Sequence, residues 1–231
     1  MNSRGEKDFI KLPRFAAKLY DYMTQGYNTQ LQIEEIACYL ASKINVGRLL
    51  DIGTGPGRLL YVINNINPEI ELYGLDISIS MVEQAKKNLK DNNVNLKVGN
   101  IEKTEYKDDF FDIITTTGSF YLWDNPEDSI NEIYRILKVN KSAYLFETYK
   151  NYNEYDYKKA LKANLKNENI LRKSFSPYFL NKQLQMTYKI SEIKDILDKT
   201  RFNSNYHISK IELSGLPTWL KIDLNKTINT D

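Results

Sequence analysis

The sequence predicts a doubly wound α/β fold, in which helices cover both faces of a seven-stranded, mostly parallel sheet. Short apolar and β-branched runs alternate with longer segments whose apolar residues recur at helical spacing, a pattern typical of parallel strands joined by crossover helices. In addition, one predicted strand runs into a glycine-rich turn that opens a helix. At 231 residues the chain fits one sizeable domain and is short for two, so we expect residues 1–231 to form a single domain.

The first part of the chain predicts a helical N-terminal cap over residues 1–46. Between Phe15 and Ile44 the apolar and aromatic residues recur at helical spacing, and Gly26 interrupts them. Because glycine weakens a helix interior, we expect two helices that are broken near Gly26.

The core of the sheet is expected over residues 47–148, where strands and helices alternate. The run from Phe111 to Thr116 is apolar and β-branched almost throughout, which indicates a strand buried on both faces. Ser78 or Ser80 can cap the helix that follows the second strand. The expected strands are 48–52, 71–76, 94–98, 111–116 and 142–148, and the expected helices are 57–65, 80–92 and 126–137.

The last third of the chain departs from this alternation and then returns to it. Residues 149–187 do not alternate cleanly, and we interpret them as an inserted lid: one lysine-rich helix followed by a loop through Ser176 and Pro177. Over residues 188–231 we expect a helix at 190–200, a strand at 205–213, a turn at 215–217 and a final strand at 219–224. These two strands complete a sheet of seven.

The composition argues against several classes of protein. Cys38 is the single cysteine and His207 the single histidine, which leaves no intramolecular disulfide and no cysteine-rich or two-histidine metal motif. We therefore expect no metal site. The sequence has no apolar run of about 18 residues that could cross a bilayer, and its N-terminus lacks the apolar segment of a signal peptide. We expect a cytoplasmic protein without a membrane span.

The charge balance gives no global reason to expect a nucleic-acid partner, because 32 basic and 30 acidic residues leave a net charge of only +2. Locally, the stretch 150–189 is cationic. Two interpretations of this stretch stay open: a solvated helix face, or a surface for an anionic acceptor. Its basic residues are Lys150, Lys158, Lys159, Lys162, Lys166, Arg172, Lys173, Lys182 and Lys189, against the acidic Glu154, Asp156 and Glu168.

The strongest local signal is the segment 49–57, Leu-Leu-Asp-Ile-Gly-Thr-Gly-Pro-Gly, a buried strand that runs into a turn. Gly53 and Gly55 lack a Cβ, so they can adopt backbone angles closed to other residues and let a ligand lie directly on the main chain. The helix that begins near Gly57 offers free N–H groups and a positive dipole end. The turn therefore predicts a site for an anionic or zwitterionic ligand.

The spacing of these glycines distinguishes between ligands. A dinucleotide-binding turn, G-x-G-x-x-G, counted from Gly53, needs glycine where this chain has Arg58. The third glycine comes one residue earlier, at Gly57. This G-x-G-x-G turn, preceded by Leu-Asp-Ile, resembles motif I of the class I S-adenosylmethionine-dependent methyltransferases. The resemblance implies a Rossmann-like fold, S-adenosyl-L-methionine as cofactor and S-adenosyl-L-homocysteine as product. The cofactor contacts that it implies in this turn are Asp51, Gly53, Thr54, Gly55 and Gly57.

Two further loops agree with this family, in order along the chain. Asp76 ends the second predicted strand, about twenty residues on, where a carboxylate can accept charge-assisted hydrogen bonds from a ribose diol. The next residues resemble the family segment beside adenine, which implies contacts from Ile77 and Met81. Asn100 and Ile101 resemble the loop that recognises the adenine edge. Many relatives have aspartate at the position of Asn100, but an asparagine carbonyl can also accept from the adenine amino group.

The segment after the fourth strand resembles the family loop that faces the methionine moiety and the acceptor, which implies cofactor contacts from Thr117 and Gly118. Many relatives carry histidines where this chain has Phe120 and Tyr121, which weakens the case for a histidine base. His207 falls in a predicted strand, where we expect a core or surface role. The residues expected to line the acceptor site are Tyr20, Tyr27, Phe120, Tyr121, Trp123 and Tyr149.

The resemblance runs from about residue 49 to residue 148 and is greatest to the small-molecule group that includes the ubiquinone and menaquinone biosynthesis methyltransferases. In this family the protein mainly has to align the reactants for an in-line displacement and exclude water. We therefore expect methyl transfer to a small-molecule acceptor, with no residue evident as a general base. The sequence leaves open the acceptor, the methylated atom and the oligomeric state.

Three alternatives stay open from the sequence. The first is an RNA methyltransferase that uses the basic lid against phosphates, although the sequence lacks an appended RNA-binding module. The second is a non-catalytic S-adenosylmethionine-binding scaffold subunit, against which the intact glycine turn and Asp76 argue. The third is aminopropyl transfer, which is disfavoured because no acidic amine-binding cluster follows the fourth strand.

Overall fold

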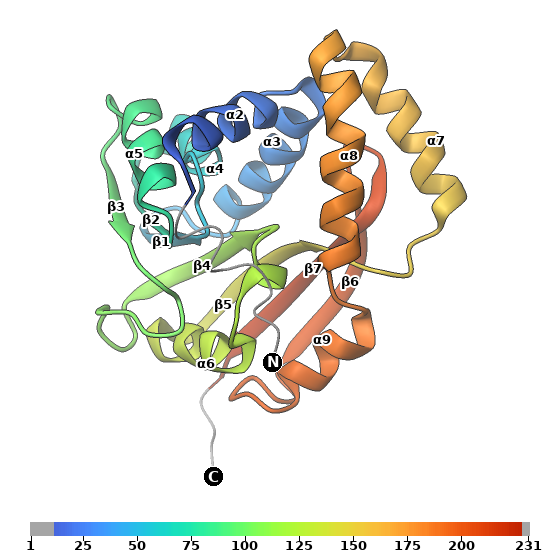
Figure 1. Cartoon of the computed structure of the whole chain (residues 1–231). Helices are drawn as coiled ribbons and strands as arrows, with labels where there is room; N and C mark the ends of the chain where they lie inside the picture. The colour runs from blue at the N-terminus through green and yellow to red at the C-terminus, as the bar shows by residue number, and fades with distance from the viewer. Residues whose placement is uncertain (1–11, 228–231) are drawn as a thin grey trace.

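The chain folds into three layers, with helices on both faces of a central sheet (Figure 1). The computed structural model describes residues 12–227. In this range the strands are β1 (Gly47–Ile52), β2 (Ile70–Asp76), β3 (Val94–Val98), β4 (Phe111–Thr117), β5 (Leu137–Thr148), β6 (Tyr206–Leu213) and β7 (Leu216–Lys226). The helices are α2 (Arg14–Thr24), α3 (Tyr27–Ala41), α4 (Arg58–Ile66), α5 (Ile79–Asn88), α6 (Pro126–Ile136), α7 (Glu154–Asn164), α8 (Ile170–Met186) and α9 (Ile190–Leu197), with short 3₁₀ helices η1 (Phe120–Leu122) and η2 (Leu165–Asn167).

The seven strands of residues 12–227 form one sheet in the order β3-β2-β1-β4-β5-β7-β6. Strands β1 to β5 pair in parallel, whereas β7 runs antiparallel to both of its neighbours, β5 and β6. The chain crosses from β3 at one edge to β4 in the centre, so the strand order reverses between β1 and β4. The doubly wound, mostly parallel sheet of seven strands is therefore confirmed, and a ligand crevice is expected at this reversal.

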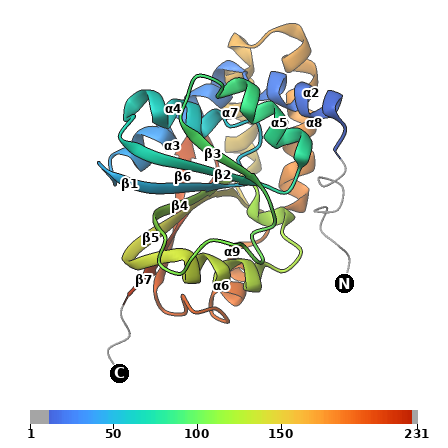
Figure 2. The same cartoon turned by 90° about the vertical axis from the view of Figure 1, so that its left-hand side faces the viewer.

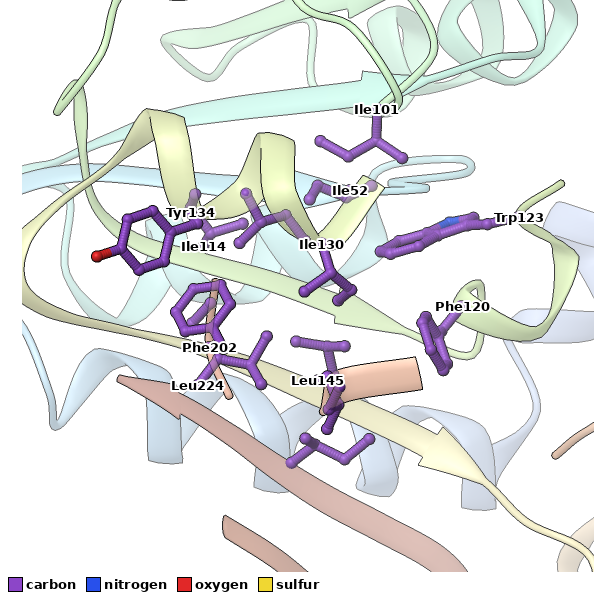
Figure 3. Close-up of a cluster of buried hydrophobic side chains, with 14 of the residues drawn as sticks. Ile52, Ile101, Ile114, Phe120, Trp123, Ile130, Tyr134, Leu145, Phe202 and Leu224 are labelled. Carbon is purple, nitrogen blue, oxygen red and sulfur yellow. The ribbon is translucent and has the colours of Figure 1, made fainter. Parts of the chain in front are cut away.

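Two apolar clusters fill the spaces between the sheet and its helices. Adjacent residues of β1 enter different clusters, because side chains alternate along a strand: Leu49 joins the cluster with α3 and α4, and Leu50 joins the one with α6 and α9. Figure 2 shows these helix pairs on opposite faces of the sheet. Figure 3 shows the second cluster, where Ile130 of α6 and Leu145 of β5 are both fully buried.

The helix break expected near Gly26 is confirmed, since α2 ends at Thr24 and α3 begins at Tyr27. A Cβ at Gly26 would lie 2.8 Å from the Glu168 carboxylate, so glycine lets a distant segment approach the start of α3. Oε1 of Glu168 accepts a hydrogen bond from the Asn28 N–H at 3.3 Å. The segment 149–187 is thus packed against the first helices of the chain.

Residues 149–187 contain two helices joined by η2, so the expected loop through Ser176 and Pro177 is wrong. Both residues lie inside α8. A proline inside a helix costs about 3 kcal/mol, which is why it indicated a break. Here other contacts offset that cost: the Asn169 side chain caps the helix by accepting from the Arg172 N–H at 3.0 Å, and Leu184 is buried.

Two strands are longer than the sequence indicated. Strand β5 begins at Leu137, because the residues between the expected helix and the expected strand form an irregularity within β5, where Asn140 has a φ of 59°. Strand β7 begins directly after the two-residue turn Ser214-Gly215, both residues having positive φ, as a tight hairpin requires. Pro217 therefore lies within β7, at the point where its register with β6 shifts, so its missing N–H disrupts no regular pairing.

None of the helices in residues 12–227 is long and apolar enough to cross a bilayer. Most of the N-terminal stretch in which we expected no signal peptide, residues 1–11, lies outside the described residues.

Replacement of Gly57 by alanine tests the packing of the turn that precedes α4. Gly57 has a φ of 78°, and an added Cβ would lie 2.6 Å from Cδ1 of the buried Leu89. Gly215 is a matched control: its φ is 73°, and its Cβ would meet no described atom within 4 Å. Both changes carry left-handed strain of about 1–2 kcal/mol, and Gly57→Ala adds roughly 1–3 kcal/mol of overpacking.

Urea unfolding measures both variants. We expect Gly57→Ala to lower the free energy of unfolding by at least about 1 kcal/mol more than Gly215→Ala does. Equal losses would mean that Leu89 moves aside without cost and that only the backbone angle demands glycine at residue 57.

Candidate functional site

A pocket opens at the carboxyl ends of β1, β2 and β4, where the strand order reverses. Its volume is about 770 Å³, counting the space at its open mouth. Helix α2 contributes Tyr20 to the wall, and η1 contributes Tyr121. The pocket therefore lies between the carboxyl ends of the central strands and the N-terminal helix α2.

The glycine-rich turn after β1 is fixed to β2 by main-chain hydrogen bonds. The N–H groups of Gly53 and Thr54 donate to the Leu75 carbonyl oxygen at 2.8 and 3.1 Å. A Cβ at Gly53 would lie 2.6 Å from the Ser119 side chain, so glycine lets the loop after β4 approach the turn. Gly53 and Gly55 consequently expose main-chain atoms to the pocket.

The carboxylate of Asp76 connects the two turns that form this end of the pocket. Its Oδ2 accepts a hydrogen bond from the Gly55 N–H and its Oδ1 accepts one from the Ser78 N–H, both at 2.8 Å. Burial raises the pKa of Asp76, while these two N–H groups oppose that shift. Each carboxylate oxygen keeps a lone pair, so Asp76 can still accept hydrogen bonds from a ligand in the pocket.

Asp51 lies behind the glycine turn and does not line the pocket. Burial raises the pKa of Asp51 to about 7, the nearby Thr54 side chain opposes this shift, and the charge of Asp76 adds to it. Two carboxyl groups therefore share a desolvated region beneath the turn. A positive charge bound nearby would stabilise their ionised forms.

The wall beyond Asp76 combines apolar side chains with one amide. Ile77, Met81 and Ile101 supply the apolar part, and Asn100 lies among them. Oδ1 of Asn100 accepts a hydrogen bond from the Glu102 N–H at 2.9 Å, which fixes the amide in the loop after β3. This arrangement suits a flat heterocycle whose edge carries hydrogen-bonding groups.

The opposite end of the pocket is aromatic. Tyr20, Tyr121 and Trp123 line it, and the Tyr20 ring comes within 3.8 Å of the position a Cβ would take on Gly55. Burial raises the pKa of the Tyr121 hydroxyl, with smaller contributions from Tyr20 and Glu147. Burial likewise raises the pKa of Tyr20, with a contribution from Asp76. Both phenols are therefore neutral at pH 7.

Helix α2 is held over the pocket by Asp21, the residue after Tyr20. The buried Asp21 carboxylate accepts hydrogen bonds from Arg58 of α4 at 2.9 Å and from Gln84 and Asn88 of α5, each at 3.1 Å. A carboxylate that accepts several bonds at once fixes its helix in both position and rotation. The position of Tyr20 thus depends on contacts with two helices of the core.

The structure brings most of the expected site residues together. Among the expected cofactor contacts, the pocket wall contains Gly53, Gly55, Asp76, Ile77, Met81, Asn100, Ile101, Thr117 and Gly118. Among the expected acceptor contacts, it contains Tyr20, Tyr121 and Trp123. Within the described residues the wall does not contain Asp51, Thr54, Gly57, Tyr27, Phe120 or Tyr149.

The expected aromatic contacts that fall elsewhere do so for identifiable reasons. Phe120 is buried, and its ring centroid lies 5.2 Å from those of Trp123 (Figure 3) and Tyr188. It therefore supports the pocket residue Trp123 from behind. Tyr149 is buried after the end of β5, and Tyr27 is half exposed at the start of α3. His207 is exposed on β6, as expected for a surface role.

Several pocket residues were not predicted from the sequence. Ile52 and Leu75 are apolar residues at or near the ends of β1 and β2. Each is adjacent in sequence to an expected cofactor contact, and this position could have indicated that it lines the pocket. No residue-level pattern distinguished the remaining ones, because loop conformation brings them to the wall. They are Gly99, Ser119 and Leu122.

Glu147 was also not predicted as a site residue, although a carboxylate in a largely apolar strand could have indicated a special role. It is fully buried near the end of β5, and its Oε1 accepts hydrogen bonds from the Ser119 and Phe120 N–H groups at 3.0 and 3.1 Å. Among the described residues its Oε2 has no hydrogen-bond partner. Burial raises the pKa of Glu147 to about 8, although the N–H groups of the loop after β4 oppose this shift. Glu147 therefore holds that loop, and at pH 7 it is largely protonated.

The raised pKa makes the stability of the protein depend on pH. Between the ordinary glutamate pKa of 4.5 and about 8, the folded protein binds the Glu147 proton more tightly than the unfolded chain does. Its contribution to the free energy of unfolding is therefore fully present below pH 4.5 and is lost as the pH rises to 8. Glu147→Gln keeps Oε1 as an acceptor but cannot titrate. Over this pH range we expect its free energy of unfolding to fall by roughly 3–5 kcal/mol less than that of the natural protein.

Urea unfolding at a series of pH values measures this difference. Glu34→Gln, which changes an exposed carboxylate of α3, serves as the control and should follow the natural protein. If Glu147→Gln has the same pH dependence as the control, then Glu147 titrates normally in the folded protein and burial does not perturb it.

The fold and the pocket define a doubly wound α/β protein with a ligand site at the point where its strand order reverses. Comparison with known proteins narrows this class. The family described as "Methyltransferase domain" matches residues 45–201. The chain belongs to this family, and it is a class I S-adenosylmethionine-dependent methyltransferase.

One curated relative is the demethylmenaquinone methyltransferase of Thermotoga maritima. It is 28% identical over 142 residues, which cover 60% of this chain and 60% of that protein. The matches to the first three curated relatives cover 68%, 43% and 60% of their lengths. The chain therefore matches only about two fifths to two thirds of the length of these relatives.

Two solved structures share the fold over nearly the whole chain. A protein described as an S-adenosyl-L-methionine-dependent methyltransferase, from Methanococcus maripaludis, has a TM-score of 0.71 at 23% identity and covers 93% of each chain. The plantazolicin methyltransferase BamL has a TM-score of 0.70 at 19% identity and covers 97% of this chain and 95% of its own. The latter was solved with S-adenosylhomocysteine and a desmethylplantazolicin analogue.

Proposed function

We propose that this protein transfers a methyl group from S-adenosyl-L-methionine to a small-molecule acceptor held at the aromatic end of the pocket. The observation that carries this proposal is the division of one pocket into two parts. A glycine turn with Asp76 lies at one end, and the rings of Tyr20, Tyr121 and Trp123 lie at the other. A cofactor and an acceptor would meet between them.

The residues at the first end fit the cofactor. The main chain of Gly53 and Gly55 would lie against its methionine portion, and Asp76 would accept hydrogen bonds from its ribose hydroxyls. Ile77, Met81 and the loop that carries Asn100 would enclose the adenine. When bound, the cofactor supplies an electrophilic methyl group on a sulfonium.

The aromatic end fits a flat, largely apolar acceptor. Tyr20 and Tyr121 come from different parts of the chain, so their rings can exclude water from both sides. Aromatic faces also stabilise a nearby cation such as a sulfonium. The names of the relatives support an acceptor of this kind, since the Thermotoga maritima enzyme is named for demethylmenaquinone.

Within residues 12–227, the side chains that line the aromatic end include no carboxylate and no histidine. The neighbouring phenols of Tyr20 and Tyr121 keep their protons, because burial raises the pKa of each. Glu147 lies behind the loop after β4 and is itself mostly protonated at pH 7. The acceptor would therefore arrive as a nucleophile already, or lose its proton to water, while the protein aligns it.

Calorimetry with S-adenosylhomocysteine and S-adenosylmethionine tests this proposal. We expect micromolar binding that Asp76→Ala weakens at least tenfold, about 1.4 kcal/mol, because the variant removes the carboxylate that holds both turns. Glu71→Ala is the matched control, since Glu71 is an exposed carboxylate near the other end of β2. NAD should not bind to any of these proteins.

Failure of the natural protein to bind either compound would overturn the proposal. Equal affinities for Asp76→Ala and Glu71→Ala would contradict the role given to Asp76. Circular dichroism on each variant separates loss of binding from loss of the fold.

A further inference from the structure

Helix α8 has an apolar face that is largely open to solvent. Leu171, Phe175, Tyr178 and Phe179 recur at intervals of four, three and one residues, which places them on one side of the helix. Each of these side chains is between 47% and 64% exposed. The opposite side of the helix carries the buried Leu184. Helix α8 therefore has apolar side chains on the side that faces the protein and also on the side that faces solvent.

Helix α2 repeats this pattern. Phe15, Leu19 and Tyr22 are spaced by four and three residues and are between 36% and 73% exposed. The two helices meet where the Arg172 guanidinium lies 4.4 Å from the centre of the Tyr22 ring and donates a hydrogen bond to the Tyr22 carbonyl at 2.8 Å. Figure 1 shows α2 and α8 in contact at one end and diverging from there.

Both helices border the mouth of the pocket. Tyr20 of α2 lines the pocket directly. On α8, Nε2 of Gln183 lies 3.3 Å from the position that a Cβ would take on Gly118, which is also a pocket residue. Each helix therefore has one side at or near the pocket and exposed apolar side chains elsewhere on its surface.

The charges on these helices are almost entirely positive. Within its bounds α8 has the exposed Lys173 and Lys182, an Arg172 that is paired with Glu168, and no carboxylate. Helix α2 adds the exposed Lys18, and its one carboxylate, Asp21, is buried and paired with Arg58. Lys182 follows Tyr178 by four residues, so a positive charge continues the apolar stripe of α8.

We propose that the surface formed by α2 and α8 docks onto an anionic phospholipid membrane, with the aromatic side chains in the interface and the lysines at the headgroups. Exposed aromatic residues beside lysines are the combination by which helices lie in a membrane surface. Extended groups of exposed apolar side chains often mark an interaction site. A second copy of the chain fits less well, since it would bring two positive surfaces together.

Docking in this way brings α2 and α8, the two helices that border the pocket, to the lipid surface. An apolar acceptor dissolved in the membrane would then enter the pocket close to that surface. The membrane contact itself does not depend on the methyl transfer proposed above.

Co-sedimentation of the full chain with vesicles tests this surface. We expect binding to vesicles of phosphatidylcholine mixed with phosphatidylglycerol, little binding to phosphatidylcholine alone, and weaker binding as salt is added. The double variant Phe175→Ser with Phe179→Ser should lower the partition coefficient at least tenfold. The variant Lys182→Glu, which reverses the charge next to the apolar stripe, should weaken the preference for the anionic lipid.

The matched control is Ile66→Ser, which changes a side chain that is 45% exposed at the end of α4 remote from the pocket. It should bind vesicles like the natural protein. Calorimetry with S-adenosylhomocysteine on each variant shows whether the fold and the pocket persist, so failure of membrane docking is distinguishable from failure of the proposed methyl transfer.

Three results would overturn the inference. One is absence of binding to the anionic vesicles. Another is equal vesicle binding by the serine double variant and by Ile66→Ser. The third is that the protein binds single-stranded RNA, or self-associates in sedimentation velocity, but does not bind vesicles. In that case the same α8 variants would abolish the RNA binding or the self-association.

Discussion

The two turns that shape the pocket depend on one buried carboxylate, Asp76. It accepts an N–H from the glycine turn after β1 and another from the turn after β2, so neither turn can move without breaking a charge-assisted bond. The Leu75 carbonyl adds two main-chain bonds to the same glycine turn. A small group of polar contacts therefore fixes the main chain along which a cofactor would lie, and the parallel pairing of β1 with β2 brings these contacts together.

Burial has a second consequence around the pocket. Asp51, Asp76 and Glu147 all lie in surroundings that disfavour their negative charge, and burial raises the pKa of each. A cation bound nearby reverses this effect, because it favours the ionised carboxylates. The cofactor of this family is a sulfonium that also carries an ammonium group. The protein thus places carboxyl groups where their charge is costly without a ligand and stabilising with one.

The segments outside the sheet determine how the pocket meets its surroundings. Helix α2 is fixed on the core through Asp21 and thereby places Tyr20 at the aromatic end. Helix α8 reaches the same entrance through Gln183, beside the loop that Glu147 holds. The rigid core and these outer helices therefore have different tasks: the core would hold the cofactor, and the helices would control what approaches it.

The sequence by itself determined the sheet, its doubly wound and mostly parallel arrangement, and most of the residues at the cofactor end of the pocket. Those features depend on local rules: alternation of strands and helices, glycine spacing, and a carboxylate at a strand end, as at Asp76. Only the tertiary structure decided which aromatic rings face the pocket. It buries Phe120 behind the wall but places Tyr121 in the wall, because loop conformation separates neighbours that look alike in sequence. It also decided that Pro177 lies inside a helix and that Glu147 holds a loop, since both outcomes depend on contacts between segments far apart in the chain.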